Sequence, residues 1–244
     1  MKKFLLFSFF VILLHQFAAA QDKHFTQFYA APLTLNPALT GSFEGRYRVS
    51  TIYRNQWKKV LDNPFKTVAL ATDLRFPART RSKSKDAIGL GLLFFNDKTG
   101  VIDFSTTQIA LSLAYHKSLG SNDRQYLSLG IQGGLTQRNV NYASLTFHDQ
   151  FDGSTGYTMD TGEDLPINNF SYSDFNVGPN YMAEFGRHGR IYAGVGLHHF
   201  AQPKISFYEN TEKGDRLYRK ISGQLSANIP LNRSGRVSLL PRVL

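Results

Sequence analysis

The feature that most constrains the fold is an alternation of apolar with small or polar residues. It is found at residues 107–116, 127–135, 191–198 and 220–229. In the first of these stretches, for example, Ile109 and Leu111 alternate with Ala110 and Ser112. A period of two places successive side chains on opposite faces of a β-strand. The sequence therefore predicts an all-β protein.

The pattern and the turn residues between alternating runs predict nine strands. We expect them at residues 46–55, 66–76, 87–96, 103–116, 125–138, 173–185, 190–201, 217–229 and 235–244. Several exceed the ~5–6 residues usual in a soluble sheet and reach the ~9–11 residues that a tilted strand needs to cross a membrane. The polar face is rich in Gly, Ser and Gln but poor in Lys and Glu, which suits a crowded lumen better than a solvent face. These features favour a transmembrane antiparallel β-barrel over residues 46–244, with a soluble β-sandwich or lipocalin-like barrel as the alternative.

The lengths of the connections predict how such a barrel is oriented. Three links are tight, at residues 119–123, 186–189 and 232–235, and two are longer, at residues 139–172 and 202–216. Membrane barrels carry short turns in the periplasm and longer loops outside the cell. The first strand then starts in the periplasm, so the residues before it are predicted to lie on that side.

The first residues have the features of a secretory signal. Lys2 and Lys3 precede the stretch 4–14, which is apolar apart from Ser8, and three alanines end at Ala20. This apolar run is shorter than the ~20 residues of a membrane-spanning helix. We therefore predict that residues 1–20 are a signal peptide, cleaved before Gln21.

Composition and motifs give no indication of catalysis, so no catalytic, cofactor-binding or metal residue is predicted and the expected protein is not an enzyme. The chain has no cysteine, and its net charge of +10 comes from scattered basic residues that form no nucleic-acid-binding tract. The triplet 160–162 reads Asp-Thr-Gly as in aspartic proteases but has no second copy, and the acidic residues around it fit no EF-hand. On a regular strand, His198 and His199 would point to opposite faces and could not share a metal.

Four short motifs carry a resemblance to a known family. They are residues 24–29 (His-Phe-Thr-Gln-Phe-Tyr), 36–41 (Asn-Pro-Ala-Leu-Thr-Gly), 53–57 (Tyr-Arg-Asn-Gln-Trp) and 238–241 (Ser-Leu-Leu-Pro). Together they closely resemble the PorP/SprF family of outer-membrane proteins of Bacteroidetes. The resemblance implies a barrel in outer-membrane lipid that assists type IX secretion or surface anchoring of a partner with a sorting domain, such as an adhesin of gliding motility. It also implies contacts with periplasmic components of the secretion machinery and its motor.

Residues 21–45, which contain the first two motifs, are predicted to form a plug or a periplasmic segment; a disordered leader is the alternative. Asn36 can cap a single helical turn, Pro37 can take its first position and Gly41 can end it. Phe25, Phe28 and Tyr29 can pack on the lumen or the periplasmic rim. All six residues are candidates for contact with a partner or for the plug.

Arg54 and Trp57 are candidates for the lumen and for an aromatic girdle, respectively. The alternative function is a porin-like passive channel. Because nine strands is an odd number and family members look longer, we also expect the barrel to be incomplete beyond Leu244.

Overall fold

The structure is a computed structural model of the whole chain. It describes residues 25, 27–78, 85–100, 103–119, 123–154, 156–208, 216–232 and 237–244. The predicted signal peptide, the predicted cleavage site and His24 lie outside the described residues.

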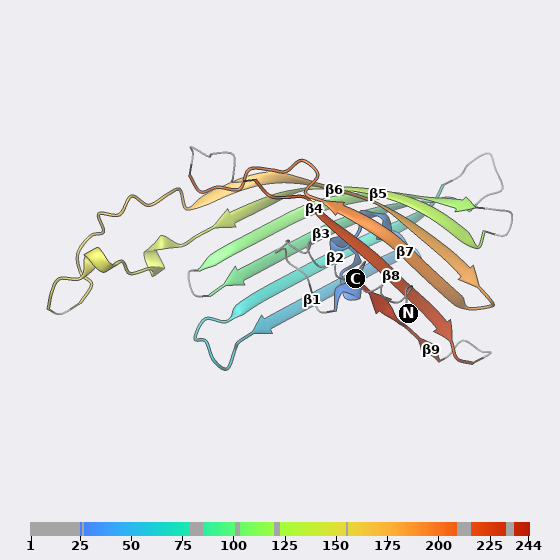
Figure 1. Cartoon of the computed structure of the whole chain (residues 1–244), viewed down its shortest axis with the longest axis horizontal. Helices are drawn as coiled ribbons and strands as arrows, with labels where there is room; N and C mark the ends of the chain where they lie inside the picture. Colours follow the sequence, from blue (N-terminus) through green and yellow to red (C-terminus); the bar gives the residue numbers. More distant parts are fainter. Residues whose placement is uncertain are drawn as a thin grey trace, which may run out of the picture.

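The described residues form one antiparallel sheet of ten strands. The strands are β1 (Tyr47–Gln56), β2 (Phe65–Pro77), β3 (Ala87–Thr99), β4 (Phe104–Leu119), β5 (Gln125–Asn139), β6 (Asn169–Phe185), β7 (Gly189–His198), β8 (Lys220–Pro230), β9 (Ser238–Leu239) and β10 (Arg242–Val243). Strands β1 to β8 pair in chain order, and both β9 and β10 pair with β8. The sheet is strongly curved and stays open between β1 and β10 (Figure 1). No helix among the described residues is long and apolar enough to cross a membrane.

The two faces of the sheet invert the usual distribution of side chains in a soluble protein. The outer, convex face carries exposed apolar residues, among them Leu70, Leu74, Leu90, Leu92, Leu111, Leu113, Leu127, Leu129, Ile131 and Leu135. The inner, concave face buries polar ones, such as Asp73, Ser128 and Asn180. Leaving one such large apolar side chain in water forgoes about 1.5–3 kcal/mol relative to burial. This arrangement is consistent with the wall of an outer-membrane β-barrel whose apolar face meets lipid.

The first eight predicted strands are confirmed, whereas the ninth is wrong as a continuous strand. The two short strands β9 and β10 continue in one register along β8, because Leu239 pairs with Ile229 and Arg242 with Ser226. The ladder is interrupted between them at Pro241, whose nitrogen carries no hydrogen to donate.

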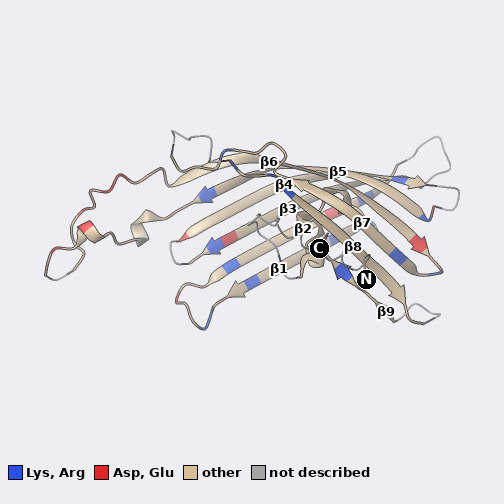
Figure 2. Ribbon diagram, in the orientation of Figure 1, with Lys and Arg blue, Asp and Glu red and all other residues tan. Residues whose placement is uncertain are grey.

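The connections follow the predicted alternation only in part, because the link after β3 is short (residues 100–103) and the link after β2 is longer (residues 78–86). The long connections 140–168 and 199–219 lie at one end of the sheet, and the turn 186–188 lies at the other (Figure 1). The longest connection extends away from the sheet and contains two short 3₁₀ turns, η5 (Tyr142–Ser144) and η6 (His148–Gln150). Most charged residues lie towards the strand ends and in the connections (Figure 2). Which end faces the cell exterior remains a prediction.

A charged side chain introduced on the apolar convex face should destabilise the protein in a bilayer. Leu129 lies within β5, as the fifth of its 15 residues, and is 59% exposed. In a bilayer, Leu129→Arg should destabilise the protein by about 2–4 kcal/mol, because the guanidinium would sit in hydrocarbon. Urea unfolding in lipid vesicles measures this loss. The control is Val60→Arg, at a residue that is 73% exposed but lies outside the strands, and its effect should stay within about 0.5 kcal/mol. Equal costs for the two variants would contradict a lipid-facing convex surface.

Candidate functional site

The N-terminal segment, residues 27–45, lies on the concave face of the sheet as a chain of short turns (Figure 1). It contains three 3₁₀ turns, η2 (Phe28–Ala30), η3 (Pro32–Thr34) and η4 (Pro37–Leu39), and η4 contacts β4, β5 and β6. The segment therefore occupies the middle of the sheet. Whether this segment acts as a plug or as a periplasmic segment remains a prediction.

The last turn forms as its sequence predicts. Asn36 has an extended backbone, and its Oδ1 accepts the N–H of Ala38 at 2.8 Å. Pro37 occupies the first position of η4, where no N–H is needed. Gly41 follows with φ of +71°, a left-handed conformation that costs glycine little. The capping prediction for these three residues is confirmed.

The amide of Asn36 also replaces a backbone hydrogen bond that is missing between β6 and β7. In the register between β6 and β7, Pro179 lies opposite Val195, and the ladder is interrupted there because proline has no N–H. Asn36 Nδ2 donates to both carbonyls, at 2.9 Å to Pro179 and 3.2 Å to Val195. A buried carbonyl without a donor costs about 1–3 kcal/mol, so this side chain stabilises the sheet and the segment together.

Polar side chains of the concave face satisfy the backbone of the segment. The contacts are Gln132 Nε2 to the Leu33 carbonyl (3.1 Å), His198 Nε2 and Ser222 Oγ to Leu35 (both 3.0 Å), Arg48 to Leu39 (3.0 Å), His116 Nε2 to Thr40 (2.8 Å) and Arg75 to Gly41 (2.8 Å). Asp73 accepts the Gly41 N–H at 2.7 Å. Because a carbonyl oxygen only accepts, each histidine must carry its proton on Nε2 for these bonds. Strands β1, β2, β4, β5, β7 and β8 thus each hold the segment.

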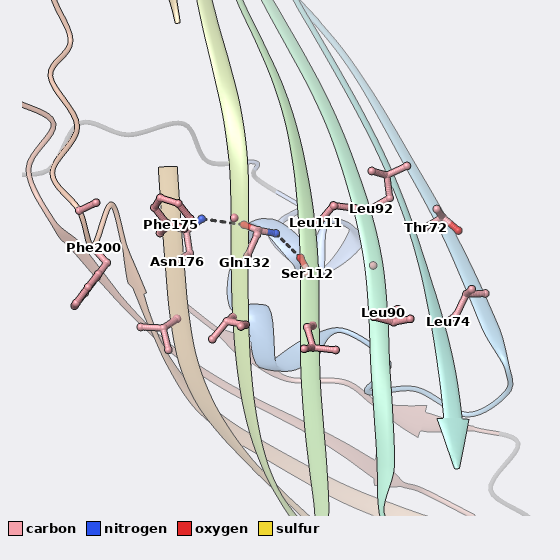
Figure 3. A pocket seen from close by; sticks show the side chains of 16 residues that line it. Thr72, Leu74, Leu90, Leu92, Leu111, Ser112, Gln132, Phe175, Asn176 and Phe200 are labelled. Carbon is pink, nitrogen blue, oxygen red and sulfur yellow. Dashed lines mark hydrogen bonds between the residues drawn. The ribbon is translucent and has the colours of Figure 1, made fainter. Parts of the chain in front are cut away.

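Gln132 links this network across the sheet. Its Nε2 also donates to Ser112 Oγ at 2.7 Å, and its Oε1 accepts from Asn176 Nδ2 at 2.9 Å (Figure 3). All three residues are buried, and they belong to three neighbouring strands. The polar face is therefore a connected network that fixes the position of η3.

Glycines on the concave face make room for the backbone of the segment. A Cβ at Gly130 would lie 2.2 Å from Ala38 N and from the Pro37 carbonyl carbon. A Cβ at Gly178 would lie 2.4 Å from Asn36 Oδ1. Both distances are far below van der Waals contact, so only glycine permits this close approach.

The beginning of the segment is held by apolar contacts. Phe25 is buried against Phe95, with ring centroids 6.0 Å apart, and packs with Ala31 and Ala69. The guanidinium of Arg54 lies 5.6 Å from the Phe25 ring centroid. A second cluster joins Leu33 to Ala71, Leu93 and Ala110.

Arg54 lies on the concave face of the sheet, and its place in a barrel lumen remains a prediction. It donates to Thr67 Oγ1, which donates to Asp97 at 2.6 Å, and its guanidinium lies 3.8 Å from the same carboxylate. Trp57 follows β1 with φ of +66° and is 62% exposed. Its position at the strand end agrees with a girdle, which remains a prediction.

Two of the predicted aromatic residues, Phe28 and Tyr29, belong to the segment but are not buried by it. Phe28 is half-buried, and Tyr29 is 49% exposed, with the Arg242 guanidinium 4.3 Å from its ring centroid. Phe28 and Tyr29 also contact each other edge to face at 5.9 Å. Tyr29 is therefore exposed, and Phe28 is half-buried like Phe43 near the end of the segment.

Sequence reasoning misplaced His199. Strand β7 ends at His198, and His199 takes a left-handed conformation with φ of +56°. The alternation of faces therefore stops, and both histidines line one small cavity of about 70 Å³ with Phe25 and Asp174. His199 Nδ1 lies 2.9 Å from Asp174 Oδ2. This volume has room for a few water molecules beside the segment.

The end of the segment is joined to the sheet by charge. Glu44 pairs with Arg190 on β7, and Arg190 Nε also donates to Glu184 at 3.1 Å. The hydrogen bond from Arg190 lowers the pKa of the Glu44 carboxyl below its usual value. The pairing of Glu44 with Arg190, like the contacts of the backbone-binding side chains, was not predicted, because only the fold places Arg190 beside the segment.

An apolar groove on the other face of the sheet is no second site. It is lined by Leu74, Leu90, Leu92, Leu111, Leu113 and Phe175, among others (Figure 3). Most of these side chains belong to the exposed apolar surface of the convex face. The groove is therefore part of that exposed apolar surface.

Comparison with known proteins agrees with this architecture. A sheet with an apolar outer face and a polar inner face filled by an N-terminal segment defines a β-sheet membrane protein. Residues 17–244 match the family described as type IX secretion system membrane protein PorP/SprF. The chain therefore belongs to the PorP/SprF family, and the resemblance seen in the sequence is confirmed. No curated protein and no solved structure gives a significant match to the chain.

The close approach at Gly130 allows a direct test of whether η4 lies against β5. Gly130→Ala should displace η4, because its Cβ would overlap the backbone at residues 37–38. Limited proteolysis should then cut the N-terminal segment at least about tenfold faster, since cleavage follows the population of the released state. Gly223→Ala is the matched control, because a Cβ there meets nothing within 4 Å. Equal protection of the segment from proteolysis in both variants would refute the position of η4 against Gly130.

Proposed function

We propose that this chain is a non-enzymatic outer-membrane β-barrel component that assists type IX secretion or surface anchoring of a partner protein. Membership of the PorP/SprF family supports the role in type IX secretion. The apolar convex face supports insertion into outer-membrane lipid. The partner, a surface protein with a sorting domain, and the contacts with periplasmic components are part of the proposal.

The observation that carries the proposal is the fixed N-terminal segment on the concave face. Its carbonyl groups are bound by side chains from six strands, and Asn36 completes the pairing between β6 and β7. Such a segment fills space that a passive channel would need to keep open. This favours a binding role over the porin-like alternative.

Phe28 and Tyr29 are the proposed contact residues of the segment. Phe25, Asn36, Pro37 and the backbone of Gly41 are used in packing and capping, so their loss would first disturb the segment itself. Accessible aromatic side chains, in contrast, are frequent anchors of protein interfaces, worth about 2 kcal/mol or more at a hot spot.

The orientation of the chain in the membrane can be tested because the sequence has no native cysteine. We expect Ser154→Cys, in the long connection 140–168, to react with an impermeant thiol reagent on intact cells. His188→Cys, in the turn between β6 and β7, should react only after the outer membrane is permeabilised. The reverse labelling pattern would invert the topology.

The double variant Phe28→Ala with Tyr29→Ala tests the contact role. We expect the protein to insert normally while surface display of the exported partner falls by about tenfold or more, the effect of losing roughly 1.4 kcal/mol of binding. Flow cytometry with antibody to the partner measures display. Tyr47→Ala, which removes a 74% exposed ring at the start of β1, is the control and should leave display unchanged.

Normal display in the double variant would leave residues 28 and 29 without a contact role. Steady ion conductance by the purified protein in a planar bilayer, combined with normal display, would favour the passive channel instead.

A further inference from the structure

The longest connection, residues 140–168, is an arm that buries almost nothing of its own. Between residues 141 and 168 every described side chain is exposed or half-exposed. The arm leaves the sheet after β5, extends beyond the strand ends and returns at β6 (Figure 1). Its conformation therefore does not come from a hydrophobic core.

Two carboxylates give the tip of the arm its shape. Asp152 Oδ1 accepts the N–H groups of Ser154 (2.8 Å) and Gly156 (3.1 Å), which closes the tip. Asp149 Oδ2 accepts the N–H of Gly162 at 2.6 Å, and this bond holds the chain that follows the tip against the chain that precedes it. The Gly162 N–H holds the pKa of Asp149 below its usual value, so the carboxylate keeps its charge at neutral pH.

This shape presents apolar side chains to the outside. Phe151 and Tyr157 form a bridge with ring centroids 5.3 Å apart, and Met159 is close to them in sequence. The three are 46%, 56% and 55% exposed, respectively. Apolar side chains that gather on an exposed, preformed tip mark an interaction surface.

The charge of the arm is opposite to that of the chain. Residues 140–168 contain five Asp and Glu and no Lys or Arg, whereas the whole chain carries a net charge of +10. Asp149 and Asp152 are used in the fold of the arm. Asp160, Glu163 and Asp164 are exposed and follow the apolar tip in the sequence.

We propose that the tip of this arm, formed by Phe151, Tyr157 and Met159 with Asp160, Glu163 and Asp164, docks a basic surface with exposed apolar residues on the exported protein. Complementary charge guides encounter and selects the partner, while the apolar tip supplies buried area. The inference rests on the proposed function for the identity of the occupant. A lipid surface fits less well, because a cluster of carboxylates without any cation is repelled by anionic head groups.

The test uses the purified whole chain in lipid nanodiscs and two fluorescent peptides. Both peptides carry the same Leu and Trp residues, and every polar position is Lys in one and Glu in the other. We expect fluorescence anisotropy to show at least about tenfold tighter binding of the Lys peptide, a preference that weakens as salt screens the charges.

Two variants separate charge from apolar contact. Phe151→Ser with Tyr157→Ser and Met159→Ser removes the apolar tip, and Asp160→Asn with Glu163→Gln and Asp164→Asn removes the charge that the fold of the arm does not use. Each variant should lower the affinity for the Lys peptide by about tenfold or more. Tyr218→Ser, at a 73% exposed ring outside the arm, is the control and should leave it unchanged.

Equal binding of the two peptides, or loss of binding only in the charge variant, would overturn the proposal. A fluorophore at Tyr157→Cys that becomes buried in anionic nanodiscs without peptide would instead assign the tip to the membrane. All of these readouts use purified protein. Their failure is therefore distinct from a failure of the export experiment with residues 28 and 29.

Discussion

The structure depends on one set of interactions, the hydrogen bonds from the concave face to the backbone of residues 33–41. A segment made of short, separate 3₁₀ turns leaves many carbonyls without a partner of its own, and unpaired carbonyls are costly wherever water is excluded. Polar side chains from six strands supply the donors. In return, Asn36 supplies the donor that Pro179 cannot give to its neighbouring strand. The sheet and the segment therefore complete each other's hydrogen bonding, and each would have backbone groups without a partner if the other were removed.

The same constraint explains the composition of the strands. Large side chains that point outward are mostly apolar and exposed, as at Leu111 and Leu129, which suits contact with lipid. A side chain that points inward must either bind the segment or leave room for it, so these positions carry Gln, His and Ser or glycine. The polar face is thus not a solvent face. Its hydrogen-bonding groups and glycines match the backbone of the N-terminal segment, and this match supports the proposal of a binding role.

Much of the fold could be predicted from the sequence, and the misses have local causes. The period of two placed eight strands and both faces correctly, because alternation depends only on the geometry of each strand. It failed where the regular backbone ends. His199 adopts a left-handed conformation directly after β7, and Pro241 interrupts the last strand. The turn at Asn36–Gly41 was also predictable, since a cap, a proline and a left-handed glycine act between near neighbours.

By itself the sequence determined the strands, the faces, the capped turn and the family, because each is encoded in residues close together in the chain. Only the tertiary structure decided where the segment lies and what holds it. Asn36 and its acceptor Pro179 are 143 residues apart, and Gln132 and Leu33 are 99 apart. Nothing in the local pattern distinguishes a glutamine that binds a distant carbonyl from one that faces water. That distinction arises only when the curved sheet brings the concave side chains of many strands to the same short stretch of backbone.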